Sequence, residues 1–196
     1  MDTSSGEYAD RLIDLESAWW KRLLPVQAPY RWNLRRQGLG RTLDVGCGVG
    51  RNLASLDAGS VGVDHNEKSV EVARRRGHLA CTVEEFLAGE YAVPASFDGM
   101  LVAHVVEHMS PANAREVIGS YLPYLRPGGK VFLICPQERG YASDATHETF
   151  TTGQDLEELC RDLGLVPDDW RSFPLPRFAG KAFVYNEFNV LARKPA

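Results

Sequence analysis

Two aspartates flank a glycine-rich turn and could together bind a ligand that carries an ammonium group and a ribose. Asp44 stands two residues before the first glycine of a G-x-G-x-G turn formed by Gly46, Gly48 and Gly50. Glycines allow backbone angles and a close approach that side chains would forbid, so a ligand can lie directly on the main chain. A carboxylate at Asp44 would repel phosphates but suits an ammonium group. Asp64, further along, is placed to accept two hydrogen bonds from a ribose diol.

Three of the five histidines are candidate catalytic residues. His104 and His108 follow an apolar run at residues 97–103, and His147 lies in a polar stretch at residues 141–150. A histidine exchanges protons near neutral pH, so it can take the proton from a hydroxyl or ammonium group that is about to react.

A strand, a turn, a short helix and a second strand position the two aspartates. Residues 42–45 and 61–64 are short apolar runs typical of buried strands. We expect the helix to begin near Arg51, where its free N–H groups and positive dipole end would suit a carboxylate or phosphate. Asp64 then lies at the carboxyl end of a strand, the edge at which ligands bind in an open α/β sheet.

The rest of the chain alternates between helical and strand patterns. Amphipathic spacing and capping residues predict helices over residues 7–24, 29–37, 66–76, 110–124 and 151–163. Short apolar or alternating runs predict strands over residues 79–83, 97–103, 131–135, 165–173 and 183–192. This alternation predicts an α/β fold.

The turn with its two aspartates resembles motif I of the class I S-adenosylmethionine-dependent methyltransferases. S-adenosylmethionine carries ammonium, carboxylate, sulfonium and adenosine groups together. A dinucleotide fingerprint instead has the spacing G-x-G-x-x-G beneath a pyrophosphate. The different spacing and Asp44 therefore disfavour a nucleotide-dependent oxidoreductase. S-adenosylmethionine is the expected cofactor, and S-adenosylhomocysteine the product.

Two later segments extend the resemblance. Phe97-Asp98 followed by Val105-Val106-Glu107-His108 is similar to motif IV of the ubiquinone-biosynthesis O-methyltransferases and related small-molecule enzymes. Residues 125–130 match the Leu-Lys-Pro-Gly-Gly pattern of the same group. Over residues 40–192 the resemblance implies a single Rossmann-like, seven-stranded, mostly parallel sheet with an antiparallel last strand and helices on both faces.

The resemblance also implies which residues contact the cofactor. The set is Arg31, Asp44, Gly46, Cys47, Gly48, Arg51, Asn52, Asp64, His65, Val83, Glu84, Ala103 and His104. Arg31 ends a segment similar to one whose arginine grips the cofactor carboxylate, although the asparagine of that segment is absent; the alternative is a solvated helix charge. Thr82 stands where an aspartate usually bonds the adenine amino group, so the main chain of Val83 is the expected replacement.

Methyl transfer is a displacement at a carbon that the sulfonium already activates, so the protein has mainly to align the acceptor and exclude water. Motif IV lacks the Asn/Asp-Pro-Pro-Tyr/Phe signature of methylation at nucleobase and glutamine nitrogens, which favours a small-molecule acceptor. The histidines favour oxygen over nitrogen, and carbon stays open. We expect His147, oriented by Asp144, to remove the acceptor proton in preference to His108; each histidine could instead simply line the pocket wall.

Other interpretations exist for the same residues. His104-x-x-Glu107-His108 has the spacing of inverted zinc proteases, but there it would lie within a regular helix, whereas here an apolar strand runs into the first histidine. A metal shared with His147 is conceivable, yet nothing in the sequence requires one, so none is expected. The alternative function is a non-catalytic protein that binds S-adenosylmethionine or regulates through it.

The composition limits the partners and the compartment. The formal net charge of −4, without a block of like charges, gives no electrostatic footprint for nucleic acid. No apolar run approaches the ~20 residues of a membrane span, and the amino terminus is polar and acidic. The four cysteines are widely separated, without a C-x-x-C pair. We expect a cytoplasmic monomer or homodimer with reduced thiols that acts on a small molecule.

The chain of 196 residues fits one α/β domain with a segment in front of it. We divide it into a helical cap over residues 1–38 and a cofactor-binding methyltransferase domain over residues 39–196. The helix predicted over residues 7–24 covers one side of the sheet or, alternatively, forms a lid over the pocket. Trp19 and Trp20 are adjacent and diverge on a helix, so one of them should face the pocket or a partner.

Overall fold

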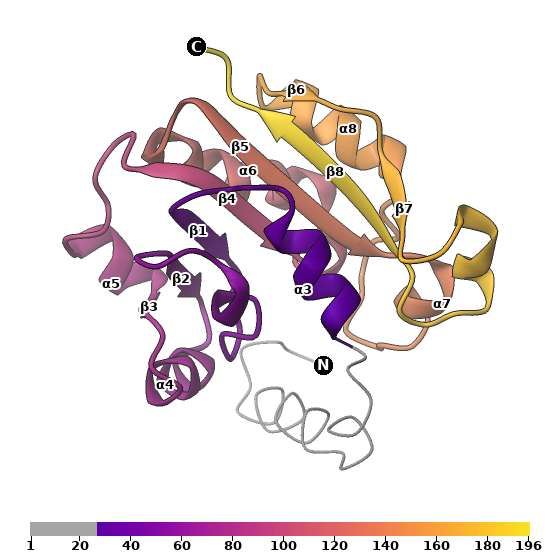
Figure 1. The fold of residues 1–196 in the computed structure, drawn as a ribbon, viewed down its shortest axis with the longest axis horizontal. Helices are drawn as coiled ribbons and strands as arrows, with labels where there is room; N and C mark the ends of the chain where they lie inside the picture. The colour runs from indigo at the N-terminus through magenta and orange to yellow at the C-terminus, as the bar shows by residue number, and fades with distance from the viewer. Residues whose placement is uncertain (1–26) are drawn as a thin grey trace. The chain divides into compact units, whose positions relative to one another are not determined.

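The computed structural model describes residues 27–196, which belong to two compact units that meet in sequence between Ala92 and Val93 (Figure 1). Each unit is built of strands with helices packed against them, as the α/β prediction requires. The helix predicted over residues 7–24 lies outside the described residues. The division at residue 38 stays a prediction. Among residues 27–196, no helix is long and apolar enough to cross a membrane.

Three parallel strands form the sheet portion of the first unit, in the order β3, β2, β1. The elements of this unit are α3 (Ala28–Arg35), β1 (Thr42–Val45), η1 (Leu53–Ser55), β2 (Val61–Asp64), α4 (Glu67–Arg75), β3 (Ala80–Thr82) and α5 (Val83–Ala88). The register sets Asp44 opposite Gly62 and Asp64 opposite Thr82. The carboxyl ends of β1 and β2 therefore lie at one edge.

Helix α4 follows directly from its sequence. The side-chain oxygen of Asn66 accepts a hydrogen bond from the Ser69 N–H at 3.1 Å, which caps the first turn. Val70 and Ala73, three residues apart on one face, are buried, and the helix packs against β2 and β3. The predicted helix over residues 66–76 and the strand beside it are confirmed.

The short helix expected to begin near Arg51 begins at Leu53 and is not an α-helix. It is a single 3₁₀ turn, Leu53–Ser55, because the chain must reverse again before β2. That reversal places the Ser60 N–H on the Asp57 carbonyl at 3.1 Å and Gly59 in the left-handed region, with φ of +81°. A dipole site at Arg51 is therefore wrong, since one 3₁₀ turn has almost no macrodipole.

The second unit pairs its strands in the order β4, β5, β8, β6, with β7 also on β8. Its elements are β4 (Phe97–Ala103), η2 (Val106–His108), α6 (Pro111–Tyr121), η3 (Leu122–Tyr124), β5 (Leu125–Pro136), α7 (Glu138–Tyr141), α8 (Gly153–Asp162), β6 (Val166–Pro167), β7 (Arg171–Phe173), η4 (Arg177–Lys181) and β8 (Glu187–Arg193). Strands β4 and β5 are parallel, whereas β8 runs antiparallel to β5, β6 and β7. The antiparallel last strand is confirmed.

Three strand predictions differ in detail from the structure. The run at residues 165–173 divides into β6 and β7, which makes eight described strands rather than seven. Strand β8 begins at Glu187 instead of Phe183, because the Phe183 N–H still closes a turn on the Ala179 carbonyl at 2.8 Å. Strand β5 starts early, at Leu125, and a register shift against β4 absorbs the turn around Gly128.

The core of the second unit is apolar and closely paired. Met100 and Leu101 of β4, Val131 and Phe132 of β5 and Val190 of β8 are all at most 2% exposed. The four cysteines are free and buried, as expected for reduced thiols. This rigid layer ends, at the carboxyl end of β4, in the first of the candidate histidines.

Candidate active site

The glycine turn is fastened to the end of β2. The N–H groups of Gly46 and Cys47 both donate to the Val63 carbonyl, at 2.8 and 3.1 Å. The Gly48 N–H donates to Oδ2 of Asp64 at 2.8 Å. Gly48 has φ of +52°, a conformation that side chains disfavour, so the sequence places glycine where the turn requires it.

Asp64 is held in place with acceptor capacity to spare. Its Oδ1 accepts a hydrogen bond from the Asn66 N–H at 2.8 Å, and Oδ2 accepts the bond from Gly48. A carboxylate offers about four lone-pair sites, so about two remain for a diol. The neighbouring His65 is exposed, with Nδ1 3.6 Å from Oδ1. The predicted ribose site is thus a pre-positioned acceptor.

Asp44 is a buried carboxyl group, and one of its oxygens lacks a hydrogen-bond donor among the described residues. It is 1% exposed, and among residues 27–196 its Oδ2 has no hydrogen-bond partner. Burial raises the pKa of Asp44 to about 8, and the negative charge of Asp64 adds to the effect. A buried carboxylate oxygen without a donor is costly. An ammonium group would supply both the donor and the countercharge, so this site fits the amino end of S-adenosylmethionine.

The remaining cofactor candidates of the first unit lie on α3, around this turn, directly after β2 and at the start of α5. Arg51 and Arg31 are exposed, and Asn52 is half-buried. Burial raises the pKa of the Cys47 thiol, which therefore stays protonated. Their contacts with a cofactor stay predictions.

Thr82 has a structural role of its own. Its Oγ1 accepts a hydrogen bond from the Glu85 N–H at 3.2 Å, and the Glu85 carboxylate accepts one from the Thr82 N–H at 2.8 Å. This reciprocal capping box begins α5 at Val83. The residue that replaces the usual aspartate is therefore a helix cap. Glu84 is exposed, and adenine contacts at Val83 and Glu84 stay predictions.

In the second unit, His104 follows Ala103, the buried last residue of β4. Its backbone is in the left-handed region, with φ of +58°, and its N–H donates to the Ile134 carbonyl at 2.9 Å. The ring nitrogens reach two carboxylates: Nδ1 lies 3.2 Å from Oε1 of Glu107, and Nε2 lies 3.0 Å from Oε1 of Glu187.

His104 is a cation in this setting. Partial loss of hydration acts to lower the pKa of His104, but the carboxylates of Glu107 and Glu187 outweigh it and raise the pKa to about 10. Both ring nitrogens then donate hydrogen bonds, so the ring has no lone pair with which to remove a proton from the methyl acceptor. Glu187 was not among the predicted site residues; the available signal was an acidic residue within a run predicted to be a strand.

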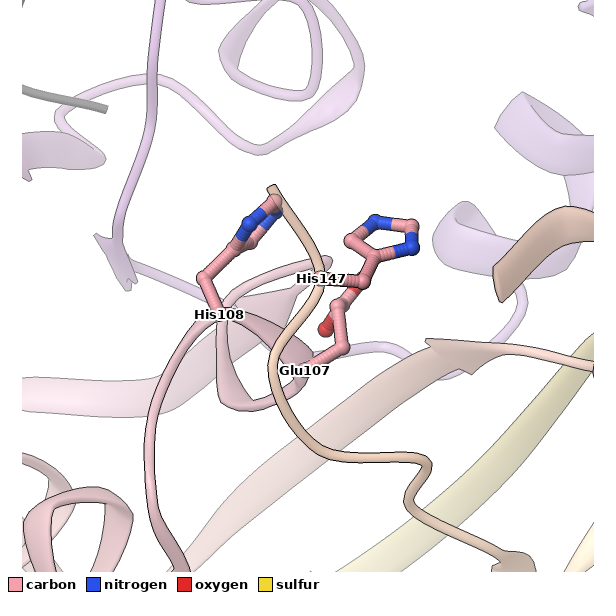
Figure 2. A group of neighbouring side chains, drawn as sticks. All are labelled: Glu107, His108 and His147. Atoms are coloured by element: carbon pink, nitrogen blue, oxygen red, sulfur yellow. The ribbon is translucent and has the colours of Figure 1, made fainter. Parts of the chain in front are cut away.

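His108 and His147 meet because the segment after α7 is tied to η2. The N–H groups of Glu148 and Thr149 both donate to the Glu107 carbonyl, at 2.8 and 3.1 Å. The two imidazole centroids are consequently 4.8 Å apart. Figure 2 shows the rings side by side, with the Glu107 side chain below them.

Backbone carbonyls fix the tautomers of both rings. Nδ1 of His108 lies 3.2 Å from the Thr146 carbonyl, and Nδ1 of His147 lies 2.7 Å from the Tyr141 carbonyl. A carbonyl only accepts, so each Nδ1 carries a proton and each neutral ring has its lone pair on Nε2. Burial lowers the pKa of His108, which favours this neutral form. In these tautomers the basic nitrogen of each ring is Nε2.

The orienting group for His147 differs from the predicted one. Oδ1 of Asp144 accepts from the N–H and the hydroxyl of Thr146, at 3.0 and 2.9 Å. The Tyr141 carbonyl holds the ring instead, and the Tyr141 ring stacks on it with centroids 5.3 Å apart. The short Asp144 side chain thus hydrogen-bonds within its own turn.

Comparison with known proteins bears on the fold that carries these groups. Residues 42–129 match the family described as "Methyltransferase domain". A methyltransferase of Archaeoglobus fulgidus described as SAM-dependent superposes with a TM-score of 0.65 at 18% identity, covering 84% of this chain and 93% of its own. The chain has the methyltransferase fold.

Two further proteins add chemical context. The 1,6-didemethyltoxoflavin-N1-methyltransferase of Burkholderia thailandensis, solved with its substrate and S-adenosylhomocysteine, superposes with a TM-score of 0.62 at 22% identity, over 97% of this chain and 86% of its own. The O-methyltransferase cnsE of Penicillium expansum is 30% identical over 141 residues, 62% of this chain and 50% of its own. The chain spans about half the length of the curated relatives that it matches.

Proposed function

We propose that the protein transfers a methyl group from S-adenosylmethionine to an oxygen atom of a small molecule. The observation that carries the proposal is the buried Asp44 oxygen without a partner among the described residues, on the strand beside Asp64. A ligand that combines an ammonium group with a ribose suits this pair of carboxylates. The methyltransferase fold and the match over residues 42–129 support the same cofactor.

Oxygen is the preferred acceptor atom because of the His108 and His147 pair. A hydroxyl has to lose its proton during methylation, and His147, whose Nδ1 is held by the Tyr141 carbonyl, has its lone pair on Nε2. The relatives named as O-methyltransferases support this choice, as does the similarity of Val105–His108 to the ubiquinone-biosynthesis group. Nitrogen is the second candidate, since the Burkholderia neighbour is named as an N1-methyltransferase.

The test is a transfer assay with methyl-labelled S-adenosylmethionine and a matched panel of phenols, catechols and aromatic amines. We expect label in hydroxyl acceptors, with calorimetric binding of S-adenosylmethionine and none of NAD. Label in amines alone would move the acceptor atom to nitrogen. Cofactor binding without transfer to any acceptor would contradict catalysis and favour the non-catalytic alternative.

Asp64→Ala should weaken binding of S-adenosylmethionine by about 1.5–3 kcal/mol, because a charged acceptor loses its hydrogen bonds to the ribose. Calorimetric titration of the purified variant measures the change. Asp57→Ala, at an exposed aspartate of the same unit, is the control and should bind as the unsubstituted protein does. Equal affinity in Asp64→Ala and the control would contradict the ribose assignment.

Asp44→Asn should remove a pH dependence of cofactor binding. Burial raises the pKa of Asp44 to about 8, so in the free protein the carboxyl is largely protonated near neutrality and an arriving ammonium group must displace that proton. Affinity should consequently rise with pH up to about 8, with proton release that calorimetry in buffers of different ionisation enthalpy detects. The asparagine variant should bind S-adenosylmethionine about 10–100-fold more weakly. Its binding should no longer release the proton that Asp44 contributes. Proton release unchanged in Asp44→Asn would assign it to another group.

A further inference from the structure

Glu107, His108 and His147 form a cluster with the composition of a metal site. One carboxylate oxygen and one ring nitrogen from each histidine lie within 4.8 Å of one another. Figure 2 shows all three side chains converging from η2 and from the segment after α7. Two imidazoles and a carboxylate are the ligands of many catalytic zinc sites and of non-haem iron sites.

The hydrogen bonds around the cluster are those that metal ligands need. A ligating histidine commonly donates its other ring N–H to a carbonyl, which fixes the tautomer and aims the free nitrogen. Nδ1 of His108 and Nδ1 of His147 both do so, toward Thr146 and Tyr141. Ligating carboxylates are likewise hydrogen-bonded, and Glu107 accepts from His104 and from the Cys135 thiol. The cluster therefore has three possible metal ligands, and each of them is held by hydrogen bonds to neighbouring groups.

The local charge also suits a cation. Glu107 is fully buried and the Glu187 side chain is 11% exposed, whereas one imidazolium, His104, stands between them. The carboxylate charge of Glu107 thus lies out of contact with solvent. A divalent ion bound to Glu107 would reduce the cost of burying that charge.

We propose that Glu107 together with Nε2 of His108 and Nε2 of His147 binds a first-row divalent ion of the zinc type. Zinc bonds of about 2.0–2.1 Å place tetrahedral ligands about 3.4 Å apart, and the candidate ligand atoms lie within 4.8 Å of one another here. The hard ions Mg²⁺ and Ca²⁺ prefer oxygen ligands and are disfavoured by two imidazoles. Three protein ligands leave a coordination position open.

Metal binding goes beyond the proposed function, but both roles would use the Nε2 lone pair of His147. An ion on Nε2 of His147 occupies the position of the proton that the proposed base accepts. Free base and metal ligand are therefore alternative states of one site, and binding should weaken at acid pH as protons compete for both imidazoles. A readout of binding alone distinguishes failure of this inference from failure of methyl transfer.

The experiment is calorimetric titration of the chelator-treated full chain with Zn²⁺, repeated with Co²⁺ to record its visible absorption. We expect one ion to bind per chain, with an affinity that falls roughly 100-fold or more in His108→Ala and His147→Asn. Loss of a residue that only hydrogen-bonds to a metal ligand already lowers metal affinity by about 10–100-fold. His78→Asn, at a half-buried histidine of the other unit, is the matched control and should bind normally. Glu107→Gln is a further variant, used once its circular dichroism shows a native fold.

A second measurement identifies the nitrogen atoms that bind the ion. In histidine ¹H–¹⁵N spectra, Zn²⁺ should shift Nε2 of His108 and His147 while both Nδ1 atoms stay protonated. Equal Zn²⁺ affinity in the cluster variants and the control would place the ion elsewhere and overturn the proposal. The absence of stoichiometric binding at micromolar protein would overturn it as well.

Discussion

His147→Asn is expected to lower kcat by about 10²–10⁴, the usual cost of losing a general base. The asparagine amide can still donate to the Tyr141 carbonyl, which now accepts from Nδ1 of His147 at 2.7 Å. The substitution therefore removes the Nε2 lone pair while keeping the anchor of the side chain. Steady-state kinetics at saturating acceptor, with a chelator present so that no ion occupies Nε2, measure the effect.

Binding data separate base chemistry from a change in shape. S-adenosylmethionine affinity should be nearly unchanged in His147→Asn, because the groups assigned to the cofactor's amino and ribose ends, Asp44 and Asp64, lie in the other unit. His78→Asn should retain full turnover, and added imidazole should restore part of the activity lost in His147→Asn. A loss smaller than about tenfold would reduce His147 to a residue of the pocket wall and leave alignment of the acceptor as the mechanism.

Local sequence signals were sufficient for the first unit. Asp44, the glycine turn and Asp64 are close in sequence, and parallel pairing of β1 with β2 alone brings them together. Helix α4 has its cap and its apolar face within one short segment. The failure was the helix near Arg51, since a glycine turn after a strand does not reveal that residues 57–59 reverse the chain before β2.

The second unit depends on contacts that no local pattern contains. His104 bonds to Glu187, a residue far along the chain that β8 brings beside β5. The sequence predicted His104 as a candidate catalytic residue beside His108 and the preferred His147, whereas these two carboxylates make it a cation. The orientation of His147 likewise rests on a backbone carbonyl, and any residue type at Tyr141 would supply one.

His104→Asn is expected to lower the free energy of unfolding by about 3 kcal/mol, the low end for breaking a buried pair. Glu107 is fully buried and would lose its cationic partner, although the imidazole itself is 46% exposed and water can enter in its place. Asparagine tolerates the left-handed backbone at this position, where φ is +58°, so the loss reports on charge rather than on strain. Arg75→Ala breaks an exposed pair with Glu71 and should change stability by less than about 0.5 kcal/mol.

The pH dependence of that loss identifies its origin. The pKa of His104 is raised from 6.5 to about 10 in the folded protein, so its contribution is complete below pH 6.5 and disappears as the pH rises to 10. The pKa of Glu107, despite the opposing effect of burial, is lowered from 4.5 by His104, so its contribution is lost as the pH falls below 4.5. The stability difference between the unsubstituted protein and His104→Asn should therefore be largest between pH 4.5 and 6.5. Urea unfolding across this range and up to pH 10 measures it, and a difference independent of pH would mean that His104 stabilises the fold by packing and not by charge.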